Sequence, residues 1–183
     1  MVLFADFNCP YSYALHERLR AMGAAVEWQG VEHAPELPVP AAPPPDRARF
    51  EREVAEVRAL AGEVPLHMPA RLPSSHLALA VAARAADLDP DGAADLRSRV
   101  FRALWVEGRD ISDPAVLRDL AGAAGLSPAL VDEPGRIELA RSPTGGVPAL
   151  VRDDGRILKG LVGPTQLRDF LAGVTEGDVE GAW

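Results

Sequence analysis

A single cysteine, Cys9, stands between a short apolar segment and a helical pattern, in the stretch FNCPYSYALHE (residues 7–17). The thiolate form of cysteine is the one that attacks disulfides and electrophiles. A cysteine at a helix start is favoured as a thiolate by the helix dipole and by backbone N–H groups that have no partner. Pro10 suits the first helical turn, where its missing N–H costs nothing. The pattern predicts a lowered pKa for Cys9; a small, buried and inert cysteine is the alternative.

Ser12 follows Cys9 by three residues, and its hydroxyl could donate a hydrogen bond to a Cys9 thiolate. Serine is also common near helix starts, so an ordinary first-turn residue is the alternative. Asp6 precedes this segment, at the end of a predicted strand. With one cysteine in the chain, an internal disulfide and a multi-cysteine zinc site are excluded.

Few basic side chains are candidates for a binding or metal site. Arg71 and His76 are suited either to binding a carboxylate of a ligand or to plain surface positions. His16 lies one to two turns after Cys9 and is expected to be a solvated helix residue. The four histidines do not have the spacing of a metal site: His16, His33, His67 and His76.

The elements around Cys9 follow from hydrophobic patterning. The segment VLFADF (2–7) reads as a buried strand, residues 10–22 as a helix that Gly23 ends, and residues 24–33 as a second strand. The order strand, helix, strand predicts a parallel pair with a crossover.

The middle and the end of the chain differ in character. Six prolines in residues 34–45 favour an extended segment that opens a new structural block. Helical patterns then fill most of the chain up to Gly125, over residues 46–63, 73–87, 91–108 and 112–125. Two apolar runs around Asp153-Asp154-Gly155 predict a hairpin over 145–160, and residues 163–173 read as a last helix.

The composition and net charge of the chain disfavour several classes of function. The 183 residues carry a formal net charge of −8, which disfavours binding to nucleic acid or to an anionic membrane. No run approaches the ~18 apolar residues of a membrane span, and no signal peptide is visible. A reducing cytoplasm is the expected compartment.

Three stretches together resemble the DsbA-like branch of the thioredoxin superfamily: DFNCPYSY (6–13), the helical block and GGVPALV (145–151). This branch includes FrnE-type oxidoreductases, 2-hydroxychromene-2-carboxylate isomerases and kappa-class glutathione transferases. LWVEGRDISDPAVL (104–117) is similar to a stretch of the FrnE-type proteins. The resemblance implies an α/β, thioredoxin-like fold with an all-helical insertion domain. Its parts would be residues 1–44 (strand-helix-strand), 45–140 (helical insertion) and 141–183 (strand-strand-helix).

The resemblance also implies roles for single residues. The family motif is Cys-x-x-Cys; Cys9 matches its nucleophile, and Ser12 stands in place of the resolving cysteine. Pro10 and Tyr11, between them, are expected to contact the substrate. Val147 and Pro148 match a loop with a cis-proline, where the backbone of the preceding residue pairs with a bound peptide or glutathione.

These matches imply a thiol-disulfide oxidoreductase of monothiol type. Cys9 would form a mixed disulfide with a disulfide-containing protein or a small disulfide, and an external thiol would resolve it, because Ser12 cannot. Glutathione or another low-molecular-weight thiol is the expected co-substrate. No metal and no tightly bound cofactor is expected, and relatives of this type are often homodimers.

Two alternatives stay open. One is a glutathione-dependent transferase or isomerase, although those relatives use serine at the position of Cys9. The other is a non-catalytic, thioredoxin-like binding protein, which a buried Cys9 with an ordinary or raised pKa would favour.

Overall fold

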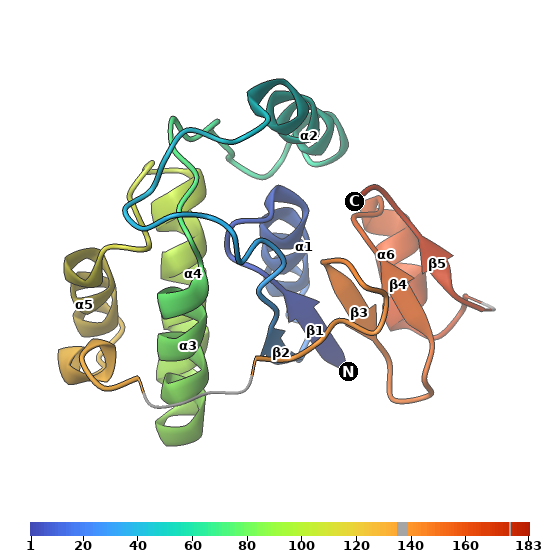
Figure 1. The fold of residues 1–183 in the computed structure, drawn as a ribbon. Helices are drawn as coiled ribbons and strands as arrows, with labels where there is room; N and C mark the ends of the chain where they lie inside the picture. The colour runs from blue at the N-terminus through green and yellow to red at the C-terminus, as the bar shows by residue number, and fades with distance from the viewer. Residues whose placement is uncertain (135–138, 176) are drawn as a thin grey trace.

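The computed structural model describes residues 1–134, 139–175 and 177–183. Figure 1 shows a mixed sheet with helices packed around it. The strands are β1 (Val2–Ala5), β2 (Glu27–Gly30), β3 (Ala149–Val151), β4 (Ile157–Lys159) and β5 (Val179–Glu180). The helices are α1 (Pro10–Ala21), α2 (Arg47–Leu60), α3 (His76–Leu88), α4 (Pro90–Trp105), α5 (Pro114–Ala123), α6 (Pro164–Leu171) and a 3₁₀ turn, η1 (Pro128–Val131).

The strands are ordered β2-β1-β3-β4-β5 in one sheet. β1 and β2 run parallel and are joined by α1, which confirms the predicted strand-helix-strand unit. β3 and β4 form the predicted antiparallel hairpin, and β3 also pairs with β1. The sequence patterns did not reveal β5, because two residues are too short to carry an alternation of apolar and polar side chains.

The helices between β2 and β3 form the predicted block, and in Figure 1 α3, α4 and α5 gather on the β2 side of the sheet. Both α2 and α4 contact α1, and α3 contacts β2, so the block is packed against the sheet part of the chain. An α/β architecture with inserted helices is therefore confirmed. The boundaries at residues 44 and 140 remain predictions.

The helix starts follow from local capping. Asp46, Asp89 and Asp113 each accept a hydrogen bond from a backbone N–H in the first turn of α2, α4 and α5, and proline follows directly at α4 and α5. The start of α3 is different. Ser75 occupies the N-cap position, but its side chain makes no capping hydrogen bond.

Aromatic side chains fix the connection between β1 and α1. The Trp105 Nε1 group of α4 donates to the carbonyl of Phe7 at 2.8 Å. The Tyr13 ring stacks on Trp105 at 6.3 Å between ring centroids, and Phe7 meets Phe101 edge to face at 4.9 Å. All four rings are fully buried. Because Phe7 lies two residues before Cys9, this cluster holds the cysteine loop in place.

Among the helices that the structure describes, none has both the length and the apolar character needed to cross a membrane.

Candidate functional site

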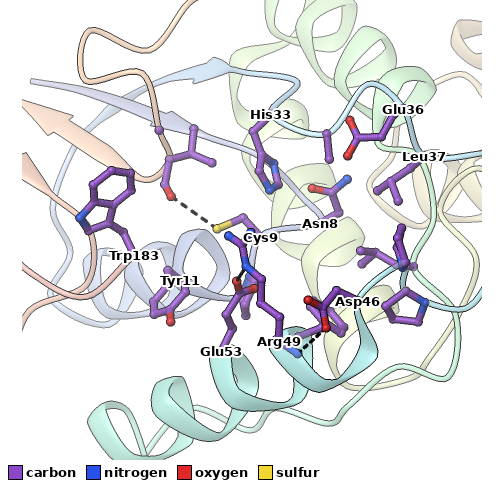
Figure 2. A pocket seen from close by; sticks show the side chains of 18 of the residues that line it. Asn8, Cys9, Tyr11, His33, Glu36, Leu37, Asp46, Arg49, Glu53 and Trp183 are labelled. Atoms are coloured by element: carbon purple, nitrogen blue, oxygen red, sulfur yellow. Dashed lines mark hydrogen bonds and ion pairs between the residues drawn. The ribbon is translucent and has the colours of Figure 1, made fainter.

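Cys9 is the N-cap residue of α1, with extended backbone angles, and Pro10 is the first helical residue. The Cys9 carbonyl accepts a hydrogen bond from the Tyr13 amide at 3.1 Å, which begins the helix. The thiol is only 4% exposed. Figure 2 shows its sulfur directed at the Val147 carbonyl, to which it donates a hydrogen bond at 3.6 Å.

Sheet pairing brings Val147 to Cys9 across 138 positions of sequence. β3 begins at Ala149, whose register partner is Phe4 of β1, so the residues just before β3 lie beside the loop that leaves β1. The Val147–Pro148 peptide bond is cis. The Pro148 carbonyl accepts from the Gly160 amide at 2.8 Å, which ties this loop to the end of β4.

Ser12 and Tyr11 also lie at this site. Ser12 is fully buried, and its Oγ accepts a hydrogen bond from the Asp6 amide at 3.4 Å. Tyr11 is nearly buried, and its hydroxyl donates to Glu56 Oε2 at 2.6 Å. The sequence-predicted residues therefore meet around one thiol: Cys9, Pro10, Tyr11, Ser12, Val147 and Pro148.

The predicted direction of the Cys9 pKa is wrong. Burial of the thiol raises its pKa from 9.0 to about 11, because a thiolate loses hydration that the protein does not replace. Hydrogen bonding from Ser12 acts in the predicted direction and lowers the pKa of Cys9, but by less than burial raises it. The nearby Asp6 carboxylate raises the pKa of Cys9 further. In this state Cys9 is a thiol at neutral pH.

Cys9 borders a cavity of about 520 Å³, within the size range of small-molecule sites. One wall is the proline-rich segment, represented by Leu37 and Pro44, and another is the start of α2. The sequence indicated that this segment opens the helical block, but not that it encloses the thiol. The polar and charged lining residues are Asn8, Tyr11, His33, Glu36, Asp46, Arg49 and Glu53.

Trp183, the last residue of the chain, lines the cavity, a position that sequence reasoning missed. Its ring lies among the lining residues near Cys9 (Figure 2), and the Lys159 ammonium sits 3.3 Å from its centroid. At Gly146 a Cβ atom would lie 2.8 Å from the Trp183 ring, so this close approach requires glycine. The tryptophan therefore packs on the glycine that precedes Val147.

A buried carboxylate and a cavity histidine form a pair at the same place. Asp6 is fully buried, and its Oδ2 accepts from His33 Nδ1 at 2.7 Å and from the His33 amide at 2.9 Å. Within the described ranges, Asp6 Oδ1 has no hydrogen-bond partner. The predicted strand over residues 24–33 is too long: β2 ends at Gly30, which leaves His33 in a loop that lines the cavity.

The other basic candidates lie elsewhere. His16 is partly buried rather than solvated; its ring packs on Phe101 at 4.9 Å, and burial lowers its pKa to about 4. Arg71 donates to the Ala41 carbonyl, and His76 pairs with Glu32; neither lines the cavity. Over residues 1–134, 139–175 and 177–183, no group of three His, Cys, Asp or Glu side chains is placed to hold a metal ion.

Comparison with solved structures shows shared architecture. A probable DsbA oxidoreductase from Streptomyces coelicolor superposes with a TM-score of 0.72 at 19% identity, over 96% of this chain and 90% of that one. The cytosolic disulfide reductase DsbM from Pseudomonas aeruginosa gives 0.67 at 24% identity, over 95% and 98%. A 2-hydroxychromene-2-carboxylate isomerase gives 0.57 at 19% identity, over 95% and 94%. No curated protein matches the chain.

The family model of the DSBA-like thioredoxin domain matches residues 1–136, which include the cysteine loop, α1 and the helical block. This match and the shared architecture confirm the thioredoxin-like fold. The chain belongs to the family of DSBA-like thioredoxin domains.

Proposed function

We propose that the protein is a thiol-disulfide oxidoreductase of monothiol type. Cys9 attacks a disulfide and forms a mixed disulfide, and an external low-molecular-weight thiol then releases the substrate half. The observation that carries this proposal is the position of the lone thiol. Cys9 begins α1 at the wall of a cavity, against the Val147 carbonyl, with Ser12 where a second thiol would stand.

The raised pKa of Cys9 slows this chemistry without abolishing it. Relative to a pKa of 9.0, a pKa of about 11 lowers the thiolate fraction at pH 7 by ~100-fold. A thiolate with a higher pKa is a stronger nucleophile, with a Brønsted coefficient of ~0.45, so the rate constant of the Cys9 thiolate is ~8-fold higher. The net cost is therefore about tenfold, which positioning against a bound disulfide is able to offset.

The backbone beside Cys9 is suited to hold such a substrate. Among the described residues, the Val147 amide finds no hydrogen-bond acceptor, and Asn8 Oδ1 is buried without a donor at the cavity wall. A peptide-like ligand supplies both a carbonyl and an amide. A DsbM structure with the reduced tripeptide GSH supports glutathione as one candidate thiol. That DsbM is described as cytosolic also supports the expected cytoplasmic location.

The test is turnover of bis(2-hydroxyethyl) disulfide by glutathione in the presence of the protein. The proposal predicts a rate above the uncatalysed reaction that Cys9→Ser removes completely. Ser12→Ala should slow the turnover without removing it, since it leaves the nucleophile in place but takes away a hydrogen bond that lowers the pKa of Cys9. Equal rates for the wild type and Cys9→Ser would contradict the proposal.

A second candidate is favoured by the burial and the raised pKa of Cys9: a non-catalytic protein that binds thiols or peptides in the cavity. It predicts saturable binding of reduced glutathione, followed by calorimetry, with no turnover and with affinity unchanged in Cys9→Ser. Turnover that depends on Cys9 would exclude this candidate.

A further inference from the structure

Asp6 and His33 form a carboxylate-imidazole pair next to the thiol. Asp6 lies at the end of β1, fully buried, and accepts two hydrogen bonds from His33 through one oxygen. The His33 side chain is 38% exposed and lines the same cavity as Cys9. Figure 2 shows the imidazole and the sulfur on neighbouring walls of this cavity.

The hydrogen bonds fix which imidazole nitrogen is free. Nδ1 is engaged by Asp6, so Nε2 is the nitrogen that remains to exchange a proton. A carboxylate that orients a histidine in this way keeps the ring in one tautomer and stabilises the imidazolium that forms once the ring has taken up a proton. Asp6 Oδ1 is buried without a partner in the described part of the chain, so the side-chain hydrogen bonds of this carboxyl group go to His33.

Thiol-disulfide exchange at Cys9 needs a group that accepts a proton and later returns it. The inference drawn from this need rests on the proposed function. Cys9 is a thiol at neutral pH, since burial raises its pKa to about 11. It must lose a proton as it attacks, and the departing thiolate must gain one. The neutral hydroxyls of Ser12 and Tyr11 are too weakly basic to take this proton, and the Tyr11 hydroxyl already donates to Glu56.

We propose that His33 is the general base and acid of the exchange and that Asp6 is its positioning residue. The Cys9 proton passes to His33 Nε2 across one water molecule, because no direct hydrogen bond joins the two side chains. The sulfur electron pair forms the new bond to one sulfur of the disulfide, and the old disulfide bond breaks. The departing thiolate takes the proton back from His33, so the products are a mixed disulfide and one free thiol.

Other titratable and charged groups share this cavity with His33 and affect how the exchange rate depends on pH. They come from α1, from the loop that carries His33, and from the start of α2. These groups are Cys9, Tyr11, Glu36, Asp46, Arg49 and Glu53, with Asp6 bonded directly to the ring.

The test is the rate of mixed-disulfide formation at Cys9 with bis(2-hydroxyethyl) disulfide, followed by intact mass from pH 6 to pH 11. His33→Ala is expected to lower this rate at least ~10-fold at pH 7. The wild type and the variant should converge near pH 11, where hydroxide ionises the thiol directly. Imidazole added to the buffer should restore part of the lost rate, which a purely structural loss would not allow.

His76→Ala is the matched control, because His76 also pairs with a carboxylate, that of Glu32 at 2.9 Å, but lies outside the cavity. It should leave the rate and the response to imidazole unchanged. A His33→Ala rate within twofold of the wild type at every pH overturns the inference. So does a uniform loss at every pH that imidazole does not restore. A wild type that forms no mixed disulfide overturns the proposed function itself, which separates the two failures.

Discussion

Cys9 should react more slowly in the folded protein than in the unfolded chain, because burial raises the pKa of its thiol. With a pKa raised to about 11, the folded thiol is ~0.01% ionised at pH 7, whereas a thiol with a pKa of 9.0 is ~1% ionised. Unfolding the chain in urea should therefore move the midpoint of Cys9 alkylation down to about 8.5, the value of a free cysteine. The assay is the rate constant for iodoacetamide from pH 6 to pH 12, measured with and without urea.

The same shift in pKa predicts how stability changes at alkaline pH. The folded state holds the Cys9 proton more tightly than the unfolded state does, so the stabilisation is complete below about pH 9 and is lost as the pH rises through about 11. A difference of about 2 in pKa corresponds to ~3 kcal/mol at most. Urea unfolding at pH 8 and pH 10.5 should show this loss in the wild type, beyond any loss in Cys9→Ser. An alkylation midpoint at or below 9 in the folded protein would refute the burial argument.

Three further perturbations test the site and its supports. Ser12→Cys should form an internal disulfide with Cys9 under mild oxidation and raise the reduction of small disulfides; absence of that disulfide by mass would mean that the two positions are misplaced. Trp105→Phe leaves the buried Phe7 carbonyl without its donor and should lower the free energy of unfolding by ~1–3 kcal/mol, measured in urea; a loss under ~0.5 kcal/mol would contradict the clamp. Trp183→Ala should speed Cys9 alkylation with little loss of stability, because its ring is 53% exposed; unchanged alkylation would show that it does not cover the thiol.

Local sequence patterns were sufficient to predict most of the helices and strands. The first strand, the helix from Pro10 and the hairpin around Asp154 each have a periodicity or a turn signal that is confined to a few neighbouring residues. The start of α5 is also set locally, because Asp113 caps the helix and Pro114 follows it directly. The two-residue β5 has no such signal and depends on pairing with β4.

The site residues that belong to short sequence motifs were predictable. The site residues that only tertiary packing brings to the cavity were not. Cys9, Ser12 and Val147 follow from short motifs, and the structure places them together. Trp183 and His33 reach the cavity only through sheet pairing and a loop, so no local pattern marked either of them. The wrong direction for the Cys9 pKa has the same origin. A helix start is visible in a sequence, but the burial that outweighs it is not.

The central claim, that folded Cys9 forms and discharges a mixed disulfide, is tested most directly by intact mass after incubation with bis(2-hydroxyethyl) disulfide. The account predicts one adduct on the folded wild type, none on Cys9→Ser, and loss of the adduct when glutathione is added. An adduct that forms only after the chain is unfolded in urea would contradict the account. It would show that the fold shields the thiol instead of using it.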